Sequence, residues 1–494
     1  MERARRLAAR SPDLVALASI VFVGATLRFA TLNLQSYRYD EAVTVGRVLH
    51  PGLFDTVSAV LRSESTPPFY YIVAWFWSRF SGTGEVGLRS LSALAGTASI
   101  VAVYLGAASL PLSRRAALIA AAIVAVSPVA IWFSQDARAY ALVFLLSALS
   151  FLFFARARRG AAARDLAWWT VCSALALATH YFAAFVVAPE AALLLWTVTP
   201  RRQVGAAVAA VLAVALLISP IALRQRQNGH AAWIAAQPVS KRLERAGAKL
   251  VGDDNGDEHG VRRPGPIPLM APAALALAAL GLLLWRGDAL ERRGAGIAAA
   301  IGGAGAALPM LLAALGADYL DGRNLIPVFV PLTILLAAGF AVRRAGWAGL
   351  GLATAFCLCS FVFTIEIDRL PRLQREDLRN AAAQIGTLRP GAVVVTPRYS
   401  ASQPLLYYLG GRRAVAPLPP LREIDLVGSA DAARENAPRI LTPAFHQIES
   451  KPVSYDFTLT RYRSSRPVRV SLRALEAGAM VGGGGRASVL SAAP

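Results

Sequence analysis

The sequence predicts an all-α polytopic membrane domain of about 11 transmembrane helices, with juxtamembrane helices on its outer surface and a small C-terminal α/β extracytoplasmic domain. The chain has 494 residues, of which 55% are hydrophobic and only 16% are charged, whereas soluble proteins have about 25% charged residues. Apolar runs of about 20 residues, the length needed to cross a bilayer, recur from residue 14 to residue 364. Beyond residue 364 the pattern changes to amphipathic and strand-like segments.

Eleven apolar runs are predicted as membrane spans. Arg28, near the outer end of the first run, is able to snorkel to the interface. Glu190 within the sixth run indicates either a functional group or a hydrogen bond to a neighbouring helix. The runs are 14–34, 88–110, 116–133, 139–155, 166–179, 181–198, 204–223, 268–285, 295–316, 325–342 and 345–364.

The aromatic run 67–77 decides the topology. Its length of about 11 residues is too short to cross a hydrocarbon core of about 30 Å, and its Tyr and Trp residues suit the membrane interface. We therefore predict a helix on the outer surface over 67–80, and a second one within 42–62. The arginine clusters between spans then all face the cytoplasm, as the positive-inside rule requires. The first span shows no small-residue cleavage site and is predicted to be retained.

Composition argues against a disulfide-stabilised or cysteine-metal protein and against a nucleic-acid-binding protein. The three cysteines lie inside apolar runs, so they indicate neither a disulfide framework nor a metal site. The net charge of +21 comes largely from arginine clusters between spans, and the chain contains no RNA- or DNA-binding motif. We therefore expect no nucleic-acid partner, and a multi-pass protein of the plasma membrane with its N-terminus inside and its C-terminus outside.

With this topology, isolated polar residues gather on the outer side of the membrane. They are Asp40–Glu41, the segment 135–138, His180–Tyr181 and the segment 318–323. The guanidinium groups of Arg138 and Arg323 suit a phosphate diester. The alternative for Arg138 is a side chain that snorkels to the interface, and the alternative for His180 is a hydrogen-bonded histidine of the core. The pattern predicts a polar site at the outer lipid–water boundary.

The outer loop 224–267 contains an acidic stretch at 252–259. A calcium loop places its glycine after the third acidic position, whereas here the glycine stands before it. We therefore interpret the stretch as a mobile polar loop. The sequence predicts no metal site and no certain cofactor, although a divalent metal is compatible with it.

The predicted α/β domain covers residues 365–476. A helix is expected over 377–388, a buried strand over 392–396, and a hairpin over 455–475 that turns at 464–466. The Gly-, Ala- and Ser-rich tail, 477–494, is expected to be disordered.

The order of motifs along residues 10–365 resembles membrane glycosyltransferases of the GT-C type, with the family 39 group of protein O-mannosyltransferases and lipid A aminoarabinose transferases as the nearest relatives. The resemblance implies a glycosyltransferase domain over 1–364. Thr66 and Asn324 depart from the family pattern, where His or Lys and Tyr are common. The motifs are Tyr39-Asp-Glu41, Thr66-Pro-Pro-Phe-Tyr-Tyr71, Gly84-Glu-Val-Gly-Leu-Arg-Ser-Leu-Ser-Ala-Leu94, Ser134-Gln-Asp-Ala-Arg-Ala-Tyr140, His180-Tyr181 and Gly322-Arg-Asn-Leu-Ile-Pro327.

The resemblance implies transfer of a hexose or pentose from a polyprenyl-phosphate donor to a glycan, glycolipid or protein acceptor at the bilayer surface. Asp40 matches the family's catalytic aspartate and is expected to act as general base in an inverting displacement, with Glu41 orienting it. Arg138 and Arg323 match the phosphate-side positions, and Tyr140 and His180 are expected to bind substrate. The alternative is a transporter or lipid flippase with a polar outer-face site, although the sequence shows no internal repeat typical of transporters.

Overall fold

The computed structural model describes residues 11–160, 162–229, 232–251, 270–441, 443–482 and 486–492. The chain forms two compact units. The helical unit contains Met1–Leu32 and Pro51–Ile367, and the mixed unit contains Asn33–His50 and Asp368–Pro494. The structure thus groups residues 33–50, which lie inside the predicted transmembrane domain 1–364, with the C-terminal residues.

The predicted fold class is confirmed. Ten of the eleven predicted spans fall mainly on one helix each, and the span 116–133 falls on the bent pair α7 and α8. Within the described residues, seven helices are long and apolar enough to cross a membrane, or eight if the bent pair α7 and α8 counts as one span. The helices at the predicted spans, including those too short for that criterion, are α2 (Ser11–Phe29), α6 (Glu85–Ala108), α7 (Arg114–Val126), α8 (Pro128–Ser134), α9 (Tyr140–Gly160), α10 (Ala163–Thr179), α11 (Ala184–Thr197), α12 (Arg201–Gln227), α15 (Met270–Arg286), α16 (Ala289–Ala314), α17 (Ile326–Phe340) and α18 (Gly346–Arg369).

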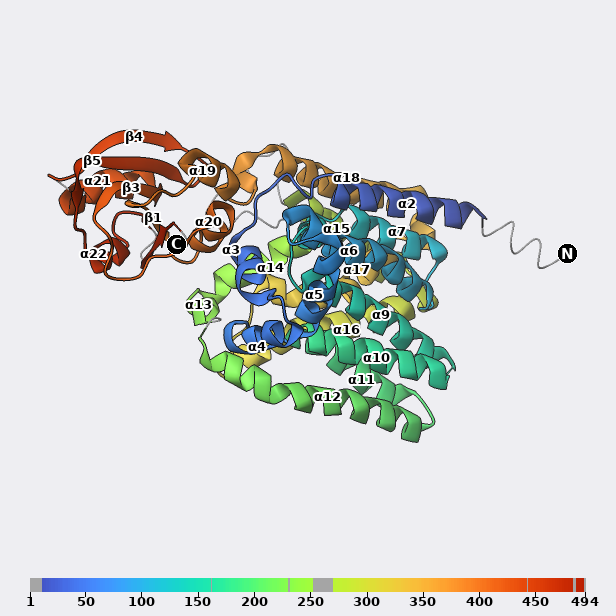
Figure 1. Cartoon of the computed structure of the whole chain (residues 1–494). Coiled ribbons are helices and arrows are strands. Elements are labelled where there is room, and N and C mark those ends of the chain that lie inside the picture. Colours follow the sequence, from blue (N-terminus) through green and yellow to red (C-terminus); the bar gives the residue numbers. More distant parts are fainter. Residues whose placement is uncertain are drawn as a thin grey trace. The chain divides into compact units, whose positions relative to one another are not determined.

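The helices of this unit pack side by side and expose apolar residues outward. Helix α9 contacts α6 and α10, and α10 contacts α12 (Figure 1). Phe22, Leu216 and Trp285 have exposed fractions of 72%, 71% and 75%. Such residues are stable on an outer surface that is covered by lipid rather than water, in agreement with a multi-pass membrane protein.

Helices α7 and α8 meet at a bend of 57°, where Pro128 cannot donate a backbone hydrogen bond. The bend leaves carbonyls at the end of α7 without helical partners. Arg28 supplies donors, because its guanidinium lies 2.8 Å from the carbonyl oxygen of Val124 and 3.0 Å from that of Ala125. The side chain of Arg28 is fully buried, so it caps this helix end instead of snorkelling.

Glu190 is also fully buried, in α11. Its carboxylate accepts hydrogen bonds from the hydroxyl of Ser150 on α9 and, at 2.9 Å, from the indole Nε1 of Trp169 on α10. The second alternative from the sequence, a hydrogen bond to neighbouring helices, is what the structure shows.

The short helices predicted near the first span are present. Helix α5 (Phe69–Ser81) begins after the proline pair 67–68 and has 13 residues, which confirms a helix too short to span. Residues 39–63 form α3 (Tyr39–Val43), the π-helix η1 (Thr44–Val48) and α4 (Leu53–Ser63).

The mixed unit contains a six-stranded sheet with strand order β2-β6-β1-β3-β5-β4, whose strands β1, β3, β4 and β5 can be followed in Figure 1. Strand β1 runs parallel to β3, and the other pairs are antiparallel. The strands are β1 (Ala392–Pro397), β2 (Arg412–Arg413), β3 (Leu421–Gly428), β4 (His446–Pro452), β5 (Thr458–Val468) and β6 (Ala487–Ser491), and the helices are α19 (Leu378–Ile385), α20 (Ser402–Leu409), α21 (Ala430–Leu441) and α22 (Leu472–Glu476).

Two expectations for this unit differ from the structure. The hairpin at 464–466 is wrong, because β5 runs straight through these residues and pairs with β3 and β4 instead of with its own continuation. The tail was expected to be disordered, yet it contributes β6 between β1 and β2, and Met480 and Val481 are buried in the core. Pairing with β1 and β2 gives β6 backbone hydrogen bonds that the composition of the tail does not predict.

Candidate active site

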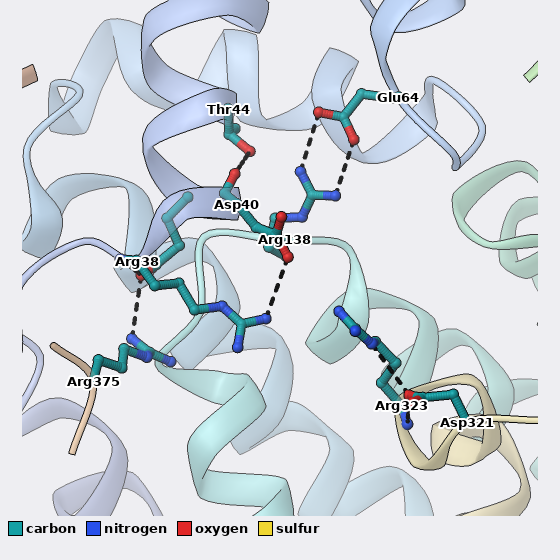
Figure 2. A network of polar contacts seen from close by, with 9 residues as sticks. Arg38, Asp40, Thr44, Glu64, Arg138, Asp321, Arg323 and Arg375 are labelled. Atoms are coloured by element: carbon teal, nitrogen blue, oxygen red, sulfur yellow. Dashed lines mark hydrogen bonds and ion pairs between the residues drawn. The ribbon is translucent and has the colours of Figure 1, made fainter. Parts of the chain in front are cut away.

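Asp40 lies in the first turn of α3, in the mixed unit. Its side chain has an exposed fraction of 37% and lies 3.6 Å from the guanidinium of Arg38 (Figure 2). The hydroxyl of Thr44 donates to the main-chain oxygen of Asp40 at 3.1 Å. Asp40 is therefore accessible to water and forms an ion pair with Arg38.

Glu41, the neighbour of Asp40, is completely buried and accepts a charge-assisted hydrogen bond of 3.3 Å from Arg375. It also accepts the backbone N–H of Arg38 at 3.2 Å, which fixes the start of α3 in the manner of a capping box. The two adjacent carboxylates thus have different environments: Asp40 faces water and Glu41 anchors the helix.

The segment before α3 is tied to the C-terminal part of the mixed unit. The hydroxyl of Ser36 donates to the carbonyl of Glu376 at 2.6 Å, and the backbone N–H of Tyr37 donates to the hydroxyl of Tyr408 at 2.7 Å. These contacts, with the Glu41–Arg375 pair, give Asp40 a defined position relative to the sheet of the same unit.

In the helical unit, Arg138 makes a bidentate ion pair with Glu64, with distances of 3.2 and 2.9 Å (Figure 2). Both residues are buried. The guanidinium also lies 5.8 Å from the ring centroid of Tyr71, whose hydroxyl is 3.4 Å from that of Thr66. The sequence interpretation of Arg138 as an isolated cation is therefore wrong: Glu64 holds its planar fork in one orientation.

The loop that carries Arg138 is fixed to the end of α2. The amide of Gln135 donates to the main-chain oxygens of Leu27 and Arg28, both at 3.2 Å, and to the hydroxyl of Thr31 at 2.7 Å. These carbonyls belong to the last turn of α2 and have no helical partner, so Gln135 caps one helix while it positions the next residues of the loop.

His180 follows α10 and is buried, with its ring centroid 5.7 Å from that of Tyr140. Burial lowers its pKa to about 3, and the positive charges of Arg138 and Arg323 contribute to the shift. The imidazole is therefore neutral at physiological pH. Both predicted phosphate-side arginines act on the same imidazole, so the structure brings Arg138, His180, Tyr140 and Arg323 into one neighbourhood of the helical unit.

Arg323 lies in the 3₁₀-helix η3 (Gly322–Leu325). Its Nε is 3.1 Å from the carboxylate of Asp321 (Figure 2). The amide of Asn324 donates to the carbonyl of Tyr319 at 2.8 Å. Arg242 of α14 (Val239–Val251) forms an ion pair with Asp318, which fixes the start of the same loop.

An apolar pocket lies among α8, α9 and α17 of the helical unit. Tyr140 and Ile326 line it, and they follow Arg138 and Arg323 by two and three residues. Phe144 and Phe329 contribute further apolar surface. The helical unit thus places an apolar pocket next to the two elements that carry its cationic side chains.

The described part of the chain contains no group of three or more His, Cys, Asp or Glu side chains that could hold a metal ion. The acidic stretch 252–259 lies outside the described residues. The side chains around His180 in the helical unit include the guanidiniums of Arg138 and Arg323, which suit an anionic ligand.

Comparison with known proteins gives two results. The family model of dolichyl-phosphate-mannose-protein mannosyltransferase matches residues 65–223. The structure of ArnT from Cupriavidus metallidurans in the apo state is similar, with a TM-score of 0.57, 12% identity, and coverage of 92% of this chain and 98% of that chain. ArnT bound to undecaprenyl phosphate gives a TM-score of 0.55, 13% identity, and coverage of 94% and 100%.

No curated protein matches the chain. The family model and the ArnT structures confirm the resemblance to GT-C type membrane glycosyltransferases that the order of sequence motifs indicates. The likeness to ArnT, at this level of identity, is one of fold.

Proposed function

We propose that the chain is an integral-membrane glycosyltransferase that moves a sugar from a polyprenyl-phosphate donor to an acceptor hydroxyl on the extracytoplasmic face of the plasma membrane. The observation that carries the proposal is the neighbourhood of Arg138, His180 and Arg323 beside an apolar pocket. This arrangement suits a ligand with an anionic head and a hydrocarbon tail. Support comes from ArnT, whose similar fold has been solved with undecaprenyl phosphate.

Arg138 and Arg323 are proposed to bind the donor phosphate. The leaving group of the reaction is a polyprenyl phosphate, which gains negative charge as the bond between the anomeric carbon and the phosphate oxygen breaks. Pre-oriented cations stabilise such charge without reorganising. Glu64 and Asp321 hold the two guanidiniums in place before the donor arrives.

Asp40 is proposed as the general base. It removes the proton of the acceptor hydroxyl while the oxygen attacks the anomeric carbon, and the electron pair of the broken bond leaves with the polyprenyl phosphate. A single displacement with one base inverts the configuration, whereas retention needs a second, nucleophilic carboxylate about 5 Å away. Glu41 is buried against Arg375, so its proposed role is to orient α3.

Tyr140 and neutral His180 are proposed to bind the donor. A neutral imidazole can both donate and accept hydrogen bonds, which suits sugar hydroxyls or a phosphate oxygen. Thr66 and Asn324 depart from the family pattern. The hydroxyl of Thr66 contacts that of Tyr71, and the amide of Asn324 donates to the carbonyl of Tyr319. We propose both residues as candidates for determining which sugar is accepted.

The test uses the purified protein in lipid nanodiscs with a panel of polyprenyl-phosphate hexoses and pentoses. A membrane extract supplies acceptor glycans, glycolipids and proteins. The proposal predicts release of polyprenyl phosphate and a labelled product with one donor of the panel. Absence of release with every donor, together with lipid movement across vesicles that contain the protein, would instead establish the transporter or flippase alternative.

The proposed orientation is tested separately. The N-terminus is predicted to lie inside and the C-terminus outside, because the arginine clusters then face the cytoplasm. A reporter fused after Pro494 should be active only outside the membrane; activity only in the cytoplasm would refute the orientation.

A further inference from the structure

Three arginines of the mixed unit lie around the residue next to Asp40. Arg47 is part of η1, Arg398 follows β1, and Arg413 is in β2. We call them the arginine cluster. All three are half-buried. The proposed reaction leaves them without a role.

The fold brings these residues together with two tyrosines. The rings of Tyr39 and Tyr399 meet edge to face with centroids 6.2 Å apart, and the guanidinium of Arg398 lies 5.7 Å from the Tyr399 ring. Strands β1 and β2 both pair with β6, and α20 contacts α3 and η1. The three arginines and Tyr39 therefore come from η1, β2, α3 and the residues after β1, all in one compact unit.

The charges of the cluster repel one another. Burial and then the charge of Arg47, with a smaller contribution from Arg398, hold the pKa of Arg413 below its ordinary value. Arg413 and Arg47 also act on Tyr39. Like charges that share a partly buried site cost free energy unless an anion neutralises them.

Asp40, which acts on Tyr39, is paired with Arg38, and no Asp or Glu among the described residues lies within ion-pair distance of the cluster. Other arginines of the mixed unit have acidic partners: Arg375 pairs with Glu41, and Arg461 pairs with Asp425. Within the described part of the chain, the side chains of the arginine cluster form no ion pair. Their acidic counterpart is therefore expected to come from a ligand.

We propose that the arginine cluster binds an anionic group, a phosphate or a carboxylate, of the glycosyl acceptor, with Tyr39 and Tyr399 in contact with the sugar that carries it. Guanidinium forks bind both anions in a bidentate manner. Tyr39 precedes Asp40 directly, so an acceptor held here lies next to the proposed base. The inference rests on the proposed function and deepens it: the acceptor is a charged glycan or glycolipid head group.

The experiment measures binding of small probes by calorimetry to the full-length protein in nanodiscs of neutral lipid. The probes are glucose 1-phosphate, glucuronate and, as the uncharged control, glucose. Wild type is expected to bind at least one of the two charged sugars and to show no binding of glucose. The double variant Arg398→Gln/Arg413→Gln is expected to bind the charged probe at least tenfold more weakly, with no loss of thermal stability.

Arg412→Gln is the matched control. Arg412 is exposed and precedes Arg413 in β2, and neighbouring side chains of a strand point to opposite faces. Its removal should change binding by less than twofold. If Arg412→Gln and the double variant lose affinity for the charged probe equally, the binding reflects the overall positive charge of the unit, and the proposed site is wrong. Absence of charged-probe binding by wild type would overturn it as well.

A second pair of measurements separates this inference from the proposed function. Undecaprenyl phosphate should bind normally to the double variant and weakly to Arg323→Ala, whereas the charged sugar should bind normally to Arg323→Ala. Loss of charged-sugar binding in Arg323→Ala, with thermal stability retained, would assign that binding to the donor site and overturn the inference. If anionic lipid in the nanodiscs abolishes probe binding, the cluster binds lipid head groups and the acceptor assignment is wrong.

Discussion

The arginines of the two units have opposite surroundings. In the helical unit, Arg138 is paired with Glu64 and Arg323 with Asp321, beside an apolar pocket. In the mixed unit, the arginine cluster has no acidic partner among the described residues and lies beside the rings of Tyr39 and Tyr399. The paired arginines are held in position before any ligand binds, whereas the cluster depends on a ligand for its counter-charge.

This difference separates stability from binding. Removing one member of a buried ion pair leaves an uncompensated charge and destabilises the fold, while removing a member of the cluster relieves repulsion. Substitutions in the helical unit should therefore affect folding and turnover together. Substitutions in the arginine cluster should weaken binding without any loss of stability.

The largest effect is expected for Asp40→Asn. The variant keeps the size of the side chain but loses the base, which typically contributes 10²–10⁴-fold. Sugar transfer by the purified protein should fall by about that factor. Because the Asp40 side chain is 37% exposed, thermal stability should hardly change. Activity within about threefold of wild type would remove Asp40 as the base and make Glu41 the next residue to test.

The second effect concerns the Arg138–Glu64 pair. Arg138→Met leaves Glu64 buried without its partner and should destabilise the protein by roughly 3–5 kcal/mol. The double variant Arg138→Met/Glu64→Gln should recover most of this stability but remain at least about tenfold less active, because the phosphate-binding fork is missing. Thermal unfolding and donor turnover measure the two quantities. Recovery of activity together with stability would mean that Arg138 is only structural.

Arg323→Ala should also reduce donor use by about tenfold or more, since a charge-assisted hydrogen bond contributes roughly 1.5–3 kcal/mol. Its partner Asp321 is not fully buried, so the loss of stability should be smaller than for Arg138→Met. The measurement is turnover of the polyprenyl-phosphate sugar. Wild-type turnover would show that Arg323 does not contact the donor.

The buried pair of the mixed unit tests the anchoring role of Glu41. Arg375→Met should lower turnover through misplacement of α3, and the double variant Arg375→Met/Glu41→Gln should recover part of the loss because no buried charge remains. The readout is kcat, with little change in acceptor KM. If Arg375→Met retains activity and Arg375→Met/Glu41→Gln does not, Glu41 acts in the chemistry and not as an anchor.

The smallest effect is a pH dependence of stability. The pKa of His180 is about 3 in the folded state and 6.5 ordinarily, so the unfolded chain binds the extra proton between these values. The free energy of unfolding should fall by about 1.4 kcal/mol per pH unit as the pH drops below 6.5. Above that pH, neutral His180 makes its full contribution to stability. Between pH 7 and pH 5, wild type should lose about 2 kcal/mol more than His180→Gln. Parallel losses in both proteins would contradict a buried neutral histidine.

The sequence predicted those features that depend on neighbours along the chain. The apolar runs predicted where the helices of the helical unit lie. The acidic pair directly after the first span singled out Asp40 and Glu41 as candidate site residues. The partners were missed, because Glu64 is 74 residues from Arg138 and Arg375 is 334 residues from Glu41. Nothing in the local pattern of either residue signals its pairing.

The same reason explains the errors in the mixed unit. A hairpin was inferred from alternation over 455–475, but alternation also fits one long strand, and only the partners β3 and β4 decide between the two. The glycine-rich tail has no local preference for a strand, yet the free edges of β1 and β2 give β6 its hydrogen bonds. Non-local pairing overrides propensity in both segments.

The central claim is that the chain transfers a sugar to an acceptor outside the membrane, and mass spectrometry of glycans and glycolipids tests it most directly. A deletion strain, the strain complemented with wild type, and the strains complemented with Asp40→Asn and Arg412→Gln are compared. We predict that the deletion and Asp40→Asn strains lack the same single sugar residue from one charged glycan or glycolipid, and that wild type and Arg412→Gln restore it. An unchanged glycan and glycolipid profile in the deletion strain would contradict the claim.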